Sequence, residues 1–373
     1  MKRIVLVGGG SGGHFYPLIA TAEALNDYRR NNYELELFYF GPTPYDAELL
    51  RAHDIAFVSC PSGKWRKYFS LLNFLDLFKL AAGFFVAFLK LYLIYPDVIF
   101  SKGSYTSVPV TVAASLLRIP VVIHESDTRP GSANKIAARF ARYIAISFDD
   151  AASYFPPDRT ALTGIPLRRS LSVHVDAPLP ALGLPEGRPL LFVTGGSLGA
   201  ERLNDLILQS LDELLPRFTI LHQSGKEQED SVQKTAASLI SDIDLLEHYF
   251  VKGSLTAEEM NLALEGAALI VSRAGTGTIY EIASKGKPAI LIPIPEEVSH
   301  DQKTNAYAYA RSGAASVLEE SNLTDGLLAA EINRIMDDTA AYGEMSAAAR
   351  AFAHQDAGAK IATTLIGIAE EHG

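Results

Sequence analysis

The feature that most constrains the fold of this chain is a short apolar segment that runs into a cluster of glycines, and it occurs twice. Ile4–Val7 leads into GGGSGG at residues 8–13, and Leu190–Thr194 leads into GGSLG at residues 195–199. Fully apolar runs of this length are typical of parallel strands buried on both faces. A helix-like segment follows each glycine cluster, so both halves of the chain begin with strand, turn and helix.

The same alternation continues along each half. Further short strands are predicted at Glu34–Phe40, Val98–Phe100, Val121–His124, Tyr143–Ile146, Thr219–Gln223, Tyr249–Val251, Leu269–Val271 and Ala289–Ile292. Strands that alternate with helices indicate crossover units and a parallel sheet. The segment Pro178–Pro189, rich in proline and glycine, is typical of a linker. We therefore predict an α/β fold of two doubly wound, Rossmann-like domains that face each other across a cleft, with ligands at the carboxyl ends of strands.

Length, charge and cysteine content restrict the class of protein. At ~150 residues per domain, 373 residues are enough for two domains. The net charge of -10 argues against a nucleic-acid partner. Residues 1–165, however, carry 17 basic and 14 acidic side chains and could meet an anionic surface. The single cysteine, Cys60, excludes an internal disulfide framework and a multi-cysteine metal site.

The most apolar part of the chain is Tyr68–Tyr95. Its longest run without a charge, Leu80–Leu89, has 10 residues, whereas a membrane-spanning helix needs ~20 apolar residues, so we expect no span here. Residues 64–95 carry five basic side chains and one acidic side chain. Their aromatic residues include Trp65, Tyr68, Phe69, Phe74, Phe78, Phe84, Phe85 and Phe88. This composition predicts a helix at an anionic membrane surface, and a buried crossover helix is the alternative.

The first glycine cluster suits a phosphate group. Because glycine has no Cβ atom, the backbone N–H groups of such a turn can approach an anion closely. At a helix N-terminus the helix dipole also favours negative charge. The pattern also fits a dinucleotide fingerprint, but that interpretation requires an acidic residue at the end of the second strand, and residues 38–42 contain none. A tight turn without a ligand is the remaining interpretation. His14 follows the last glycine and could take a proton near neutral pH, or could simply pack at the helix start.

Two segments of the second half offer a similar environment. Gly195-Gly196-Ser197 supplies N–H groups and a hydroxyl, and the small residues at 274–278 leave another helix N-terminus open to an anion. Glu281, in the first turn of that helix, could accept both hydroxyls of a ribose. It could instead form a capping box with Thr278.

Two amides and two carboxylates complete the candidates. Gln302 and Asn305 share a helix face, and amides suit sugar hydroxyls, although a solvated helix start would have the same pattern. Asp242-Ile243-Asp244 has the spelling of a metal-binding Asp-x-Asp motif, but it lies in an acidic, helix-like stretch away from the glycine clusters. We therefore predict a solvated face there and no bound metal.

Taken in order, these segments resemble one family. The matching segments are Gly8–His14 with Pro17, Ser101–Tyr105, His124–Asp127, Thr163–Arg168, Gly195–Ala200, Arg273–Glu281 and Gln302–Asn305. Each is weak alone, but together they span most of the chain in the family's order and spacing. The chain is similar to the MurG family of membrane-associated peptidoglycan N-acetylglucosaminyltransferases, which belongs to glycosyltransferase family 28.

The resemblance implies a GT-B fold and an inverting transfer. N-acetylglucosamine would move from UDP-N-acetylglucosamine to undecaprenyl-diphospho-N-acetylmuramoyl-pentapeptide, without a cofactor, at the cytoplasmic face of the cell membrane. Residues 1–165 would form the acceptor-binding, membrane-associated domain, and residues 166–345 would form the UDP-sugar-binding domain. Residues 346–373 would form a C-terminal helix that packs back on the first domain.

The resemblance also implies roles for individual residues. His14, Glu125 and Asp127 are the candidates for the catalytic base. The positions that match ligand-binding residues are Ser11, Gly12, Gly13, Arg168, Ser197, Ala257, Thr276, Gly277, Thr278, Glu281, Asp301, Gln302 and Asn305. Within this set Glu281 would bind the ribose, and the backbone at Ala257 would meet the uracil. The diphosphate of the acceptor would lie near Gly12, Gly13 and Gly103.

Three positions depart from the family pattern. The family usually has asparagine where Asp127 and Ile165 stand, and glycine where Ser104 stands. A carboxylate at position 127 could act as a base or repel a diphosphate, which leaves open a related glycosyltransferase with another lipid acceptor. A nonhydrolysing UDP-N-acetylglucosamine epimerase would share the same fold plan and is a further alternative, and a nucleotide-sugar-binding protein without catalysis is the non-enzyme alternative.

Overall fold

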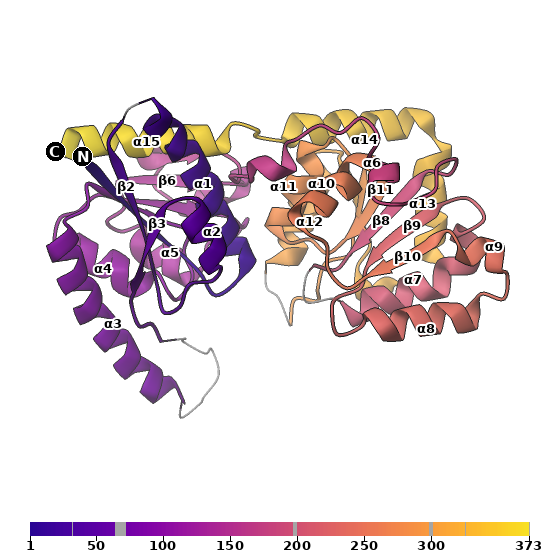
Figure 1. Ribbon diagram of the computed structural model, residues 1–373, viewed down its shortest axis with the longest axis horizontal. Coiled ribbons are helices and arrows are strands. Elements are labelled where there is room, and N and C mark those ends of the chain that lie inside the picture. Colours follow the sequence, from indigo (N-terminus) through magenta and orange to yellow (C-terminus); the bar gives the residue numbers. More distant parts are fainter. Residues whose placement is uncertain (32, 64–71, 197–199, 298–300, 325, 373) are drawn as a thin grey trace. The chain divides into compact units, whose positions relative to one another are not determined.

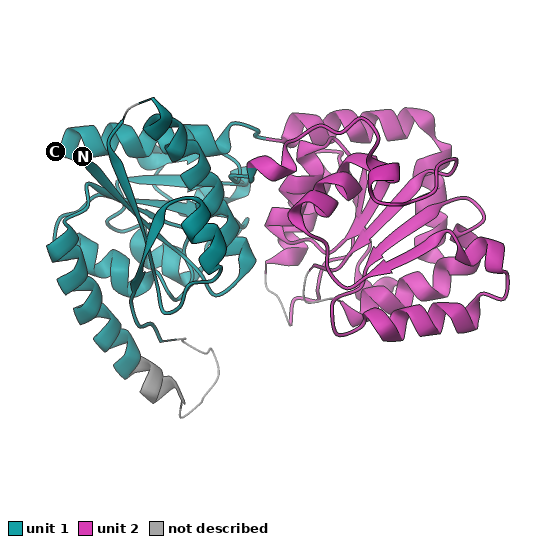
Figure 2. Ribbon diagram, in the orientation of Figure 1, with its two compact units in different colours: residues 1–168, 354–373 teal, residues 169–353 magenta. Residues whose placement is uncertain are grey.

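The computed structural model describes residues 1–31, 33–63, 72–196, 200–297, 301–324 and 326–372. The chain divides into two compact units, unit 1 with residues 1–168 and 354–373 and unit 2 with residues 169–353 (Figure 2). In each unit, helices cover both faces of one parallel sheet (Figure 1). This architecture confirms the predicted class of two doubly wound parallel-sheet domains.

The sheet of unit 1 has seven strands in the order β3-β2-β1-β4-β5-β6-β7. They are β1 (Lys2–Val7), β2 (Leu35–Gly41), β3 (Ile55–Ser59), β4 (Val98–Ser101), β5 (Val121–Glu125), β6 (Tyr143–Ile146) and β7 (Thr160–Leu162). All neighbouring strands run parallel. The chain builds outward from β1 to β3 and then returns to place β4 on the other side of β1, so the strand order reverses between β1 and β4.

Two layers of helices cover this sheet. They are α1 (Gly12–Arg30), α2 (Ala47–Ala52), α3 (Leu72–Ile94), α4 (Val108–Leu116), α5 (Ser132–Ala137) and the C-terminal α15 (Ala357–His372). On one face α1 and α15 pack against each other and over Ile4 and Leu6 of β1 (Figure 1). On the other face α3 and α4 pack over Val5 and Val7. Alternation of side chains along the strand therefore explains why β1 is apolar at every one of these positions.

Unit 2 repeats the plan with six strands in the order β10-β9-β8-β11-β12-β13, all parallel. They are β8 (Leu190–Thr194), β9 (Thr219–Gln223), β10 (Tyr249–Lys252), β11 (Ala267–Ser272), β12 (Ala289–Leu291) and β13 (Ala315–Val317). Here the strand order reverses between β8 and β11.

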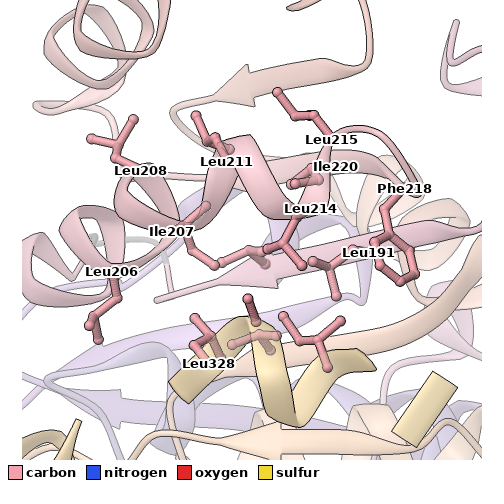
Figure 3. Packing of buried hydrophobic residues seen from close by; sticks show 14 of the residues in the cluster. Leu191, Leu206, Ile207, Leu208, Leu211, Leu214, Leu215, Phe218, Ile220 and Leu328 are labelled. Carbon is pink, nitrogen blue, oxygen red and sulfur yellow. The ribbon is translucent and has the colours of Figure 1, made fainter. Parts of the chain in front are cut away.

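Among the helices of unit 2, α7 (Glu201–Leu214) buries a regular apolar face. The helices of this unit are α6 (Pro178–Ala181), α7, α8 (Glu229–Leu239), α9 (Ile243–Leu246), α10 (Ala257–Gly266), α11 (Thr276–Ser284), α12 (Gln302–Arg311), α13 (Leu327–Asp337) and α14 (Thr339–Phe352). Ile207, Leu211 and Leu214 recur every three or four residues along α7. They pack with Leu191 of β8 and Leu328 of α13 in one buried cluster (Figure 3).

Three strands were not predicted from the sequence, and all three lie at sheet edges. β3 and β7 are the outer strands of the first sheet, and β13 is an outer strand of the second. β7 and β13 have three residues each and are partly solvated, so they lack the continuous apolar run that marks a central strand, whereas β3 was missed although it contains the run Ile55–Val58. Ala161 and Leu162 of β7, for example, are exposed.

Helix α3 has a buried side and an exposed apolar side. Gly83, Ala87 and Leu91 recur every four residues and are buried against the core. Among the side chains of this helix that the structure describes, the exposed large apolar ones are Phe78, Phe85, Leu89, Tyr92 and Leu93. The helix therefore acts as a crossover that also presents apolar surface to solvent. Within the described residues, no helix meets both the length and the apolarity that a bilayer crossing requires.

Candidate active site

The glycine-rich segments lie where the strand order reverses. In unit 1 the turns after β1 and β4 flank this point, and in unit 2 the turns after β8 and β11 do so. In doubly wound sheets this reversal opens a crevice at the carboxyl ends of the strands, which is where ligands bind. In each unit, the glycine-rich segments therefore lie at the edge of the sheet where ligands are expected to bind.

The first glycine turn packs too closely for side chains. Gly10 has a φ of +86°, and a Cβ on Gly8 would lie 2.9 Å from the Cβ of Lys102. A Cβ on Gly9 would lie 2.7 Å from the hydroxyl of Tyr39. That hydroxyl donates to the Gly8 carbonyl at 2.7 Å, so Tyr39 of β2 holds the glycine turn in place by a hydrogen bond.

His14 lies in the first turn of α1, and one of its ring nitrogens makes a hydrogen bond to the backbone. Its Nδ1 lies 3.2 Å from the carbonyl oxygen of Lys102, which can only accept, so Nδ1 carries the proton and Nε2 has the lone pair. Burial and the charge of Lys102 lower the pKa of His14, and the Asp127 carboxylate opposes them. The ring is therefore neutral at physiological pH and offers Nε2 as a proton acceptor.

A buried lysine that the sequence did not nominate organises this site. Lys102 is fully buried, and its Nζ donates to Nδ1 of His124 at 2.8 Å and to the hydroxyl of Ser126. His124 in turn donates from Nε2 to the Gly164 carbonyl at 2.8 Å. Burial lowers the pKa of Lys102 to about 8, and the Glu125 and Asp127 carboxylates limit the fall. The network links the ends of β4 and β5 to the segment after β7.

Glu125 holds the loop that follows β5. One carboxylate oxygen accepts from the backbone N–H of Asp127 at 3.0 Å. The other accepts from the N–H of Gly131 at 3.1 Å and from the amide of Asn134 at 2.9 Å. Because the carboxylate is buried and both of its oxygens are occupied, it is poorly placed to take a proton from a substrate. Asp127 is only half-buried, so its carboxylate is the more accessible of the two.

In unit 2 the helix after β11 begins without a side-chain cap. Its N-cap is Gly275, which offers no side chain, and no acidic residue lies in the first turn. Thr276 is its first residue, so Glu281 lies in the second turn. The prediction that Glu281 lies in the first turn was therefore wrong by one turn. Thr278 lies inside the helix and is not its N-cap, so it does not form a capping box with Glu281.

The amide side chains of α12 make hydrogen bonds that hold neighbouring segments of unit 2 in place. Asn305 is buried and donates to the hydroxyl of Thr276 at 3.2 Å, which ties α12 to the start of α11. The side-chain oxygen of Gln302 accepts from the N–H of Ile294 at 3.2 Å, so it holds the turn after β12. Asp301 is the N-cap residue of α12, and Ala257 is the first residue of α10. Ser197 lies outside the described residues.

The Asp-x-Asp sequence has a local structural role. The carboxylate of Asp242 caps α9 by accepting from the N–H of Asp244 at 3.0 Å. In the part of the chain that the structure describes, no group of three or more His, Cys, Asp and Glu side chains is arranged to hold a metal ion.

Comparison with known proteins identifies the family. Residues 4–146 match the glycosyltransferase family 28 N-terminal domain, and residues 190–361 match the glycosyltransferase family 28 C-terminal domain. A Treponema denticola protein named UDP-N-acetylglucosamine–N-acetylmuramyl-(pentapeptide) pyrophosphoryl-undecaprenol N-acetylglucosamine transferase is 37% identical over 337 residues, 85% of this chain and 84% of that protein. This chain belongs to glycosyltransferase family 28.

Solved structures agree with the family. The crystal structure of Acinetobacter baumannii MurG covers 98% of this chain with all of its own length, at a TM-score of 0.75 and 25% identity. A Neisseria meningitidis UDP-GlcNAc 2-epimerase covers the same share at a TM-score of 0.69 but 14% identity, a likeness of fold alone. The predicted family, fold and enzyme class are thus confirmed.

One departure from the family pattern is visible as backbone strain. Ser104, where the family usually has glycine, has a φ of +73°. A residue with a Cβ is disfavoured by about 1–2 kcal/mol in this left-handed region, whereas glycine is not. Ile165, where the family usually has asparagine, is buried.

We predict that Ser104→Gly stabilises the chain. Relief of strain exceeds the extra entropy that glycine loses on folding, so the gain should reach about 1 kcal/mol and raise Tm by about 2–4 °C. Calorimetry of the full chain measures it. Ser104→Ala keeps the Cβ and serves as the control with little change. A lower Tm for Ser104→Gly would contradict the strain argument.

Proposed function

We propose that this chain transfers N-acetylglucosamine from UDP-N-acetylglucosamine to undecaprenyl-diphospho-N-acetylmuramoyl-pentapeptide, with inversion at the anomeric carbon. The observation that carries the proposal is the match to a relative named for this transfer along most of both chains. The reaction needs an anion site for the nucleotide diphosphate and a base for the acceptor hydroxyl.

Unit 2 would bind the donor. The N-terminus of α11, with Thr276, Gly277 and Thr278, suits the diphosphate because N–H groups and the helix dipole both favour an anion there. The hydrogen bond from Asn305 fixes the hydroxyl of Thr276 for this contact. Glu281, in the next turn, would accept the ribose hydroxyls. Ser197, Asp301 and Gln302 would contact phosphate and sugar, and the backbone at Ala257 would contact uracil.

Unit 1 would bind and activate the acceptor. The backbone of Ser11, Gly12 and Gly13, together with Gly103, suits the diphosphate of the lipid. His14 would take the proton of the acceptor hydroxyl on Nε2 while the oxygen bonds to the anomeric carbon. As this bond forms, the bond from the anomeric carbon to the diphosphate oxygen breaks on the opposite face, and UDP leaves with both electrons. Arg168 and the helix N-termini would stabilise the charge on the leaving diphosphate.

One observation favours a second candidate. Asp127 places a partly exposed carboxylate in unit 1 where the family usually has a neutral amide. A negative charge there would weaken binding of a second diphosphate, so a related transferase with a different lipid acceptor is the alternative. The fold-level likeness to epimerases offers a weaker alternative, in which no lipid is required.

We predict that radiolabelled N-acetylglucosamine moves from UDP to lipid only when lipid-linked muramoyl-pentapeptide is present, with one UDP released per transfer. Without the lipid, UDP-N-acetylglucosamine should be recovered unchanged. Transfer to a different lipid would favour the second candidate. Conversion to another UDP-sugar without lipid would indicate an epimerase, and binding without turnover would reject an enzymatic role.

We predict that His14→Gln lowers kcat/KM by about 10²–10⁴-fold, the usual contribution of a general base. Since the pKa of His14 is lowered, the wild-type kcat/KM should stay level from neutral pH to below 6.5 and fall only when His14 is protonated. His14→Gln should abolish this acid limb. Asp127→Asn is the matched control and should retain the limb. If Asp127→Asn abolishes the limb while His14→Gln keeps it, Asp127 is the base.

We further propose that unit 1 binds the cytoplasmic face of the cell membrane peripherally through α3. Phe78 and Phe85 are 61% and 69% exposed, and Leu89 lies on the same side of the helix. Lys79 and Lys90 are also exposed on α3 and would favour anionic lipids. The basic residues Lys64, Arg66 and Lys67 lie outside the described residues, as do the side chains of Trp65, Tyr68, Phe69 and Phe74.

We predict that the chain sediments with anionic vesicles at low salt and that Phe78→Glu/Phe85→Glu/Leu89→Glu does not. Phe84 is left intact because it packs partly against the core beneath α3. Leu239→Glu, at an exposed position of unit 2, is the control and should sediment like the wild type. Unchanged thermal unfolding would verify the fold. A triple variant that sediments normally would reject α3 as the membrane surface.

A further inference from the structure

The guanidinium of Arg168 lies on an aromatic ring rather than beside a carboxylate. Its carbon Cζ is 4.2 Å from the ring centroid of Tyr16. Its Nε is buried and makes no hydrogen bond. Among the residues that the structure describes, no acidic side chain pairs with it. The buried Nε–H of a partly buried cation therefore lacks an acceptor, which is unfavourable inside a folded chain.

The ring of Tyr16 is itself firmly held. It packs edge-on against Tyr45, with centroids 6.0 Å apart, and against Phe15 at 5.8 Å. Phe15 is fully buried and contacts Tyr39, the residue that supports the glycine turn. A Cβ on Gly12 would lie 2.9 Å from the Tyr16 ring, so the ring also covers Gly12 closely. The same cluster of aromatic rings therefore contacts the glycine turn and also carries the ring on which Arg168 lies.

We propose that Tyr16 is a positioning residue that holds the Arg168 guanidinium for a diphosphate group of the substrates. The contact places Cζ over the ring and leaves the two terminal nitrogens of the guanidinium for phosphate oxygens, which a planar guanidinium can bind in pairs. The inference rests on the proposed function, in which both the nucleotide sugar and the lipid acceptor carry a diphosphate. It adds a residue that touches neither substrate and acts through Arg168.

The test is a double-mutant cycle between Tyr16 and Arg168. We measure the dissociation constant of UDP by calorimetry and KM for the lipid acceptor for the wild type, Tyr16→Leu, Arg168→Met and the double variant. A cation–π contact of ordinary strength predicts a loss of about threefold to thirtyfold for Tyr16→Leu in one of the two constants, and the constant that changes identifies the substrate. Tyr16→Phe keeps the ring and should restore most of the binding.

The cycle separates positioning from a general structural effect. If Tyr16 acts through Arg168, the double variant should be no weaker than Arg168→Met alone. Tyr28→Leu removes another tyrosine ring from α1 and should leave both constants unchanged. Thermal unfolding checks each variant, and Tyr16→Met, of adaptable shape, replaces Tyr16→Leu if the latter does not fold.

Two results would overturn the inference while the proposed function stands. One is a Tyr16→Leu variant that binds both substrates like the wild type. The other is a double variant whose losses multiply, which would assign Tyr16 a separate structural role. A wild-type chain that binds neither UDP nor the lipid acceptor would instead reject the proposed function, and the inference with it.

Discussion

Parallel strands that are buried on both faces can satisfy their backbone only within the sheet, and the whole site follows from that constraint. Because every strand of a sheet runs in one direction, all carboxyl ends meet at one edge. Where the strand order reverses, the segments leaving β1 and β4, or β8 and β11, diverge. A helix cannot satisfy its first backbone N–H groups internally, and glycines at the helix starts that follow allow an anion to reach them.

The two units use this edge differently. In unit 2 the helix α11 has no side-chain cap, and Asn305 donates a hydrogen bond to the hydroxyl of its first residue, Thr276. Unit 1 adds a buried cation, Lys102, whose side chain reaches His124 and whose carbonyl orients His14. One residue therefore connects the packing of three strand ends to the protonation of the candidate base. That connection explains why a charged side chain occupies a position where burial is costly.

The sequence predicted the central strands and the position of the ligand segments well, because both depend on local patterns. Apolar runs such as Leu190–Thr194 and the adjacent glycines are visible in the chain itself. The edge strands β7 and β13 were missed because three partly solvated residues are too few to form that pattern, whereas β3 contains the apolar run Ile55–Val58 and was missed despite it. Glu281 was placed one turn too early because the start of α11 depends on a glycine N-cap, which has no side-chain signature.

The supporting contacts could not be predicted, because they join residues far apart in the chain. Nothing in the local sequence pairs Lys102 with Gly164 through His124, or Tyr16 with Arg168. The signal available for Lys102 was a charge directly after a buried strand and before a glycine, which is an unusual position. For Glu125 the sequence indicated a carboxylate at a strand end but not the three donors that occupy it.

The most direct test of the central claim is a crystal structure of the full chain with UDP bound. We expect the diphosphate at the N-terminus of α11, with the carboxylate of Glu281 on the ribose hydroxyls and Thr276 beside a phosphate. A nucleotide bound away from the carboxyl edge of the second sheet, or a Glu281 carboxylate turned from the ribose, would contradict it.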